Sequence, residues 1–281
     1  MHLICFFKPH LMLTAWCAIR HDGHMLKTVP FVIRQSFFLA LAVMFACAAS
    51  PALAAPFEDT IAQRAMACTA CHGQQGRAAP DGYYPRLAGK PAGYLYNQLI
   101  NFRDDRRHYG LMTQLLTPLT DDYLMEIAQY FSQLEVPYPA PAPTNASPAL
   151  LQQGRQLVMQ GDAARNIPAC VQCHGQTMTG VAPNIPGLLG LPRDYLNAQL
   201  GAWKAGQRRA HAPDCMKDVV AKLSMEDINA VGSWLAAQPL PANTKPATEI
   251  PALAAGARGA AAISCGSAPK KNALKTAGSK P

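Results

Sequence analysis

The chain has 281 residues, of which 49% are apolar, and its formal net charge is +8. This length allows one large domain or two small ones, and the apolar content excludes an intrinsically disordered chain. The charge does not indicate nucleic-acid binding, because residues 55–250 hold 16 basic and 16 acidic residues and the excess lies at the two ends.

The first 54 residues predict an export signal. Lys27 and Arg34 precede an uncharged run at residues 37–49, which is too short to span a bilayer core of about 30 Å. Small residues then suit cleavage after Ala54. Met25 is an alternative start, because the residues before it fit a signal poorly. A short membrane anchor or a buried helix is the other reading of the apolar run. We therefore expect a periplasmic protein.

A proline-rich segment divides the rest of the chain. "VPYPAPAPT", at residues 136–144, has four prolines in nine residues, which favours a semi-rigid extended spacer. The predicted units are an N-terminal domain at 55–136, a linker at 137–147 and a C-terminal domain at 148–240. The final segment, 241–281, is rich in Ala, Pro, Gly, Ser and Lys, which predicts a mostly disordered tail.

The two predicted domains are repeats of one another. Each contains Cys-x-x-Cys-His, as "CTACHG" at 68–73 and "CVQCHG" at 170–175. "PRLAG" or "PGLLG" follows, then Tyr-x-x-x-Gln-Leu, an aromatic residue, paired arginines and a methionine, at nearly equal offsets. Chance does not explain so many matches in the same order.

The repeated segments predict helices. Pro91 and Pro192 stand where a first helical turn tolerates proline, and apolar residues then recur at helical spacing. The last helix of each repeat is expected to begin at Thr120 or Ser224, and Ser224 and Asp227 resemble a capping box. Strand signals are sparse. We therefore expect an all-α fold with two tandem domains joined by the proline-rich linker.

Cys-x-x-Cys-His is the attachment pattern of c-type haem. The thiols of Cys68 and Cys71, and of Cys170 and Cys173, would each form thioethers with a haem vinyl group. His72 and His174 would then bind the iron. Zinc usually requires cysteine pairs about 15–20 residues apart, and a redox dithiol requires a βαβ setting. A structural disulfide within each pair is a further alternative. We predict two covalently attached haems c.

The sixth iron ligand is predicted from the repeat. Met112 and Met216 follow the motif histidines at equivalent places, and thioether sulfur suits the iron of an electron carrier. The competing ligands are His108 and His211, which also occupy comparable places.

With two CxxCH motifs, "PRLAG" and "PGLLG", the Tyr-x-x-x-Gln-Leu segments and the paired methionines, the chain resembles dihaem class I cytochromes c of the cytochrome c4 type. The resemblance covers about residues 55–240. It implies two all-helical cytochrome c domains related by a pseudo-twofold axis. It also implies that the carbonyl groups of Pro85 and Pro186 accept hydrogen bonds from the haem histidines.

These features favour single-electron transfer in the periplasm rather than enzyme catalysis, because both axial positions of each iron would be filled. Expected partners are a quinol-oxidising complex or a dehydrogenase as donor, and a terminal oxidase as acceptor. Peripheral association with a membrane stays open. The alternatives are a cytochrome subunit of a periplasmic dehydrogenase complex, and a dihaem peroxidase with one open iron.

Two cysteines remain outside the leader and the motifs. Cys215 and Cys265 form an even remainder in a compartment that favours disulfides, so we expect a bridge between them. Such a bridge would fasten the tail near the second haem. The alternative is a free Cys265 in the tail and a small buried Cys215.

Overall fold

The computed structural model describes residues 58–79, 81–141, 143–248 and 265–267, together with the backbone of two short strands near the start. The chain divides into one unit at residues 1–57 and another at 58–281. The first unit contains the antiparallel strands β1 (Leu3–Phe6) and β2 (Trp16–Ile19). The predicted signal sequence and the start at Met25 lie outside the described residues.

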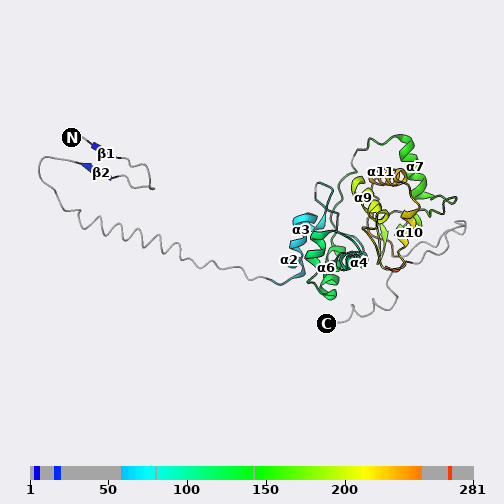
Figure 1. Cartoon of the computed structure of the whole chain (residues 1–281), viewed down its shortest axis with the longest axis horizontal. Helices are drawn as coiled ribbons and strands as arrows, with labels where there is room; N and C mark the ends of the chain where they lie inside the picture. The colour runs from blue at the N-terminus through cyan, green and yellow to red at the C-terminus, as the bar shows by residue number, and fades with distance from the viewer. Residues whose placement is uncertain are drawn as a thin grey trace. The chain divides into compact units, whose positions relative to one another are not determined.

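The first half of the second unit is a small bundle of helices (Figure 1). Its described elements are α2 (Ile61–Arg64), α3 (Met66–His72), the 3-10 turn η1 (Gln74–Gly76), α4 (Ala92–Arg103), α5 (Gly110–Leu116) and α6 (Asp121–Gln133). The hydroxyl of Thr120 accepts the Tyr123 N–H and begins α6, as the sequence predicts. α4 packs on α6, and Leu95 and Phe131 belong to one of the two buried apolar clusters of this half.

The second half repeats this arrangement. Its described elements are α7 (Pro148–Met159), α8 (Val171–His174), β3 (Gly180–Val181), β4 (Ile185–Pro186), α9 (Arg193–Lys204), α10 (Cys215–Ala221) and α11 (Met225–Ala236). The predicted capping box of Ser224 and Asp227 is present at the start of α11. α7 lies close against α11, because a Cβ at Gly154 would stand 2.1 Å from the Ala230 carbonyl oxygen. Only glycine allows this approach.

The all-α prediction is confirmed, with small differences in detail. Pro91 and Pro192 lie at the N-caps of α4 and α9, one residue before the helices begin. The sequence analysis did not predict α5 and α10, the seven-residue helices that carry the two paired methionines. Nor did it predict β3 and β4, a pair of two-residue strands. None of the described helices is long and apolar enough to cross a membrane.

The two halves meet along the segments that follow α4 and α9. Arg107 and Arg208 form an antiparallel bridge there. The His108 N–H donates to the Gln207 carbonyl at 2.9 Å, and the Arg209 N–H donates to the Arg106 carbonyl at 2.6 Å. The residues around the paired arginines therefore face each other across the junction.

The segment between the halves begins in contact with the first. The guanidinium group of Arg86 donates to the carbonyl groups of Val136 and Pro137 and lies 3.8 Å from the ring centroid of Tyr138. The described part of 137–147 contains no helix or strand. The proposed domain boundaries on either side of it stay predictions.

The described parts of the predicted tail contact the folded unit. Lys245 forms an ion pair with Glu135, and Ala247 pairs with Val181 of β3. Residues 265–267 also lie on the second half, as described below. The rest of the segment predicted to be disordered lies outside the described residues.

Candidate haem site

The first CxxCH motif forms the end of α3. Gly73 ends the helix at a φ of +73°, where a Cβ would stand 2.3 Å from the Ala78 carbonyl oxygen. His72 is buried, and its Nδ1 donates to the Pro85 carbonyl at 2.8 Å. This bond leaves Nε2 with the lone pair that a metal requires. Burial lowers the pKa of His72, so the imidazole is neutral near pH 7.

The second motif has the same geometry. α8 ends in His174, and Gly175 follows at a φ of +86°. The buried His174 donates from Nδ1 to the Pro186 carbonyl, again at 2.8 Å. Burial lowers its pKa too. Two histidines a hundred residues apart thus present the same tautomer, with Nε2 available to a metal.

The four motif cysteines are free thiols, so neither pair forms a disulfide in this structure. Cys71 is exposed and the other three are half-buried. Burial raises the pKa of Cys68 and Cys173, and raises that of Cys170 to about 12. The reduced state of all four thiols leaves each pair available for covalent attachment.

One cavity of about 1160 Å³ connects the two motifs. Small-molecule sites are typically about 300–1,000 Å³, so this space suits a large ligand or more than one. Its walls include the residues that the sequence analysis selected: Cys68, Cys71, His72, Pro85, Met112, Cys170, Cys173, His174, Pro186 and Met216.

Met112 and Met216 are the only methionines among the described residues that line this cavity. Met112 is the third residue of α5, and Met216 is the second residue of α10. Of the competing histidines, His108 lines the cavity but is largely exposed and pairs with Asp105 at 3.0 Å. His211 is not part of the described wall, and its Nε2 lies 3.2 Å from the Arg106 guanidinium.

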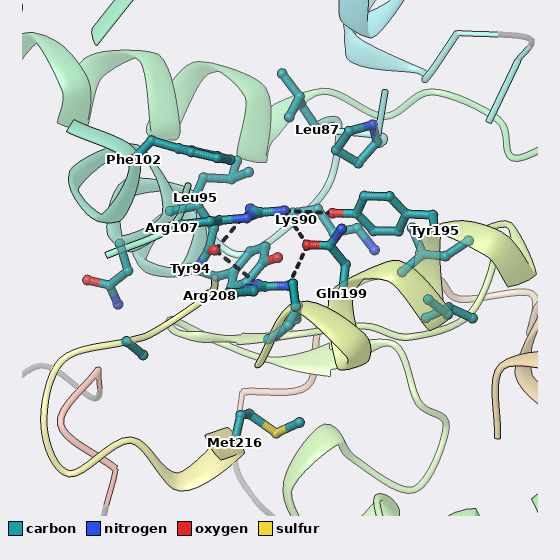
Figure 2. A pocket seen from close by; sticks show the side chains of 18 of the residues that line it. Leu87, Lys90, Tyr94, Leu95, Phe102, Arg107, Tyr195, Gln199, Arg208 and Met216 are labelled. Carbon is teal, nitrogen blue, oxygen red and sulfur yellow. Dashed lines mark hydrogen bonds between the residues drawn. The ribbon is translucent and has the colours of Figure 1, made fainter. Parts of the chain in front are cut away.

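A symmetric network of buried arginines lies between the halves (Figure 2). Arg107 donates to Gln98 at 3.1 Å and to Gln199 at 2.6 Å, and Arg208 donates to the same two amide oxygens at 3.0 and 2.9 Å. Arg107 also donates to the Tyr195 hydroxyl at 3.3 Å. Among the described residues, no carboxylate pairs with either arginine.

The same cavity wall contains further polar groups that are buried. Lys90 donates to the Gly187 carbonyl at 3.1 Å, and burial together with the charge of Arg86 lowers its pKa to about 8. Burial and the charge of Arg107 lower the pKa of Arg208 to about 10. The indole N–H of Trp203 is buried without an acceptor in the described part of the chain. These groups favour an anionic ligand edge in the cavity.

This network was not predicted from the sequence, although the equivalence of its residues in the two repeats can be read there. Arg107 and Arg208, Gln98 and Gln199, and Tyr94 and Tyr195 are each separated by the same 101 positions. A repeated offset shows that two residues are equivalent. It does not show that the two sets face each other across a shared boundary.

The structure contains the expected disulfide between Cys215 and Cys265. Cys215 is the first residue of α10 and directly precedes Met216. The bridge therefore attaches residue 265 beside the cavity wall of the second half.

An all-helical repeat with CxxCH in each half defines a c-type cytochrome. No family model matches the chain. It is 40% identical over 200 residues to a thiosulfate dehydrogenase electron acceptor from Thiomonas intermedia, covering 71% of this chain and 88% of that protein. It is 35% identical over 174 residues to cytochrome c4 from Pseudomonas aeruginosa, covering 61% and 84%. The chain belongs to the cytochrome c4 family of dihaem cytochromes.

Solved structures agree with this assignment. Reduced cytochrome c4 from Pseudomonas stutzeri aligns at 32% identity with a TM-score of 0.53, covering 63% of this chain and 95% of that one. A thiosulfate dehydrogenase (TsdBA) structure from Marichromatium purpuratum aligns at 32% identity with a TM-score of 0.56, and this chain covers 36% of it. The protein is therefore an electron-transfer cytochrome with haem c as its cofactor, and a carrier rather than an enzyme.

Proposed function

We propose that each half holds one haem c, attached through Cys68 and Cys71 or through Cys170 and Cys173. His72 and His174 would be the first axial ligands. Met112 and Met216 would be the second. The observation that carries this proposal is the shared cavity wall, where four free thiols, two identically bonded histidines and two methionines converge from equivalent places in the repeat.

When bound, each haem supplies an iron that changes by one electron between the ferrous and ferric states. The protein's residues favour this chemistry over catalysis. The Nδ1 bonds to Pro85 and Pro186 hold the imidazoles in the ligating tautomer. Met112 and Met216 would supply thioether sulfur as the second ligand, which raises the reduction potential. The peroxidase alternative requires an open iron, and two methionines in the wall argue against it.

The buried cations fit the acidic edge of a haem. Lys90, Arg107 and Arg208 bring positive charge into a cavity where their described hydrogen-bond acceptors are amide, hydroxyl and carbonyl oxygens. The rings of Phe102 and Trp203 also lie beside the two arginines. The carboxylates that a haem carries at one edge would neutralise them. Because the arginines lie between the halves, both haems would then have their charged edges near the same boundary.

The proposed partner is a periplasmic thiosulfate dehydrogenase, with the cytochrome as its electron acceptor. The similarity to a thiosulfate dehydrogenase electron acceptor and to part of a thiosulfate dehydrogenase structure favours this donor over a quinol-oxidising complex. A terminal oxidase is the proposed acceptor, and peripheral contact with the membrane would accompany that step. The export signal expected at residues 37–49 supports the periplasmic location.

A reconstituted assay tests the proposal. Purified holoprotein is mixed with thiosulfate dehydrogenase, and haem reduction is followed after thiosulfate is added. We expect reduction of both haems by catalytic amounts of the enzyme, and none without thiosulfate. Met112→Ala and Met216→Ala should each lower the potential of one haem, whereas Met225→Ala, at a methionine that is 63% exposed, should not. Reduction by a quinol-oxidising complex, with no reduction by thiosulfate dehydrogenase, would overturn the choice of donor.

A further inference from the structure

Three residues of the C-terminal segment are fixed against the second half. Cys265 is bonded to Cys215, and the described segment continues through Gly266 and Ser267. All three are half-buried. Cys265 and Ser267 also line the cavity, beside Met216. This short segment, Cys265 to Ser267, is called the strap below.

Gly266 fits tightly against the loop that leads to Met216. Its N–H donates to the Pro213 carbonyl at 2.8 Å. A Cβ at this position would stand 2.1 Å from the Ala212 carbonyl oxygen and 2.7 Å from that of His211. Because these neighbours are backbone atoms, no larger residue can take the place of Gly266 without moving the strap off the loop.

The strap also reaches the first half. The Ser267 carbonyl accepts a hydrogen bond from the Asn97 side-chain amide, at 2.8 Å. Asn97 lies on α4, and its equivalent in the repeat is Ala198, which has no such donor. The strap therefore connects the ligand loop of one half to a helix of the other.

The ligand loop of the first half has no such fastening among the described residues. Leu111 takes the position equivalent to Cys215, directly before Met112, and no disulfide can form there. The two methionine loops thus have equivalent places in the repeat and unequal attachments.

We propose that the strap is a positioning device for the sixth ligand of the second haem. This proposal rests on the proposed function, in which Met216 binds the iron of the second haem. With Cys215 bonded to Cys265 and Gly266 seated on the loop, the strap moves with the loop, and opening of the loop requires Ser267 to leave Asn97 of the first half. Met216 therefore dissociates less often than Met112, and exogenous ligands enter the second haem more slowly.

The test is carbon monoxide binding to the ferrous holoprotein. The methyl signal of each iron-bound methionine, assigned with Met112→Ala and Met216→Ala, identifies which haem reacts. In the double variant Cys215→Ser/Cys265→Ser we expect binding at the second haem to be about tenfold faster, a typical size for coupled sites. Gly266→Ala should have the same direction of effect with the disulfide intact. Asn97→Ala, which copies Ala198, should have a smaller one.

Binding at the first haem is the internal control and should not change in any of these variants. If the double variant does not fold, cleavage of the disulfide in wild-type ferrous protein with a water-soluble phosphine gives the same comparison without a substitution. Unchanged carbon monoxide binding at the second haem after removal of the bridge would overturn the strap proposal. A different outcome would contradict the proposal that Met216 binds the second haem: Met216→Ala would then leave both methyl signals in place.

Discussion

The segments that carry Met112 and Met216 differ more between the two halves than the CxxCH motifs do. The motif histidines have the same donor atom, acceptor residue type and distance in both halves. Met112 and Met216 both lie on seven-residue helices, but the residue before Met216 is a disulfide-bonded cysteine and the residue before Met112 is an exposed leucine. The groups that would hold a haem are thus repeated, whereas the groups that stabilise their surroundings differ between the halves.

The largest effect should come from removing one attachment pair. Cys68→Ser/Cys71→Ser and Cys170→Ser/Cys173→Ser each remove both thioether positions of one half. We expect each double variant to contain one covalent haem, and the wild type two. Intact mass after extraction with acidic acetone checks this. Two retained haems in either variant would contradict the equivalence of the halves.

Core truncation should separate the stabilities of the halves. Phe131 on α6 and Leu235 on α11 are each 1% exposed. Phe131→Ala should cost about 3–5 kcal/mol of unfolding free energy, and Leu235→Ala about 2–5 kcal/mol, each in its own half. Once the expected leader with Trp16 is removed, Trp203 and Trp234 remain, and both lie in the second half. Denaturation of the mature protein followed by tryptophan fluorescence therefore reports on that half. A fluorescence transition that shifts equally in both variants would mean that the halves unfold together.

A marked acidic contribution to stability should lie in the second half. Burial alone raises the pKa of Asp227, but hydrogen bonds from Arg165, the Ser224 N–H and Gln153 outweigh it and lower the pKa to about 2. A carboxyl group whose pKa is lowered by folding stabilises the folded state at pH values above its unfolded-state pKa. That contribution is lost as pH falls from about 4 to about 2.

Asp227→Asn should therefore lower the unfolding free energy by on the order of 2 kcal/mol at pH 7, with the gap to wild type closing below pH 4. Urea denaturation between pH 2 and pH 7, followed by far-ultraviolet circular dichroism, which reports on the helices of both halves, checks this. Tyr123 takes the equivalent position in the first half, so Tyr123→Phe is the matched control and should show no such pH dependence. If the difference in unfolding free energy between Asp227→Asn and wild type stayed constant with pH, the lowered pKa assigned to Asp227 would be contradicted.

The smallest difference concerns the helix caps. Thr120 caps α6 with one hydroxyl bond, whereas Ser224 and Asp227 cap α11 reciprocally. Thr120→Ala and Ser224→Ala should each cost about 0.5–2 kcal/mol, with the smaller loss for Ser224→Ala, because the Asp227 carboxylate still accepts the backbone N–H of residue 224. Thermal unfolding by circular dichroism measures both. A larger loss for Ser224→Ala would show that the retained bond to the Asp227 carboxylate adds nothing.

Local signals in the sequence predicted the parts of the fold that depend on local chemistry. Helical spacing and capping residues predicted α4, α6, α9 and α11, because each buries one apolar face and begins at a recognisable cap. α5 and α10 were missed because seven residues are too few for a clear helical period. The network of Arg107 and Arg208 was missed for another reason: it depends on how two halves face each other, which no local pattern reports.

The same distinction applies to the candidate site. The cysteines and histidines are adjacent in sequence, so their chemistry can be read directly from the motif. Met112 and Met216 were selected only through the repeat, and their place in the cavity wall depends on folding over forty residues or more. The attachment of Ser267 to Asn97 joins residues 170 positions apart, and nothing in either segment alone indicates it.

The most direct test of the central claim is proton magnetic resonance of the ferrous holoprotein. Methionine methyl groups bound to haem iron give signals shifted far from the rest of the spectrum. We predict two such signals, one lost in Met112→Ala and the other lost in Met216→Ala, with Met225→Ala retaining both. A single shifted signal in the wild type, or two signals that survive either substitution, would contradict the assignment of one His/Met haem to each half.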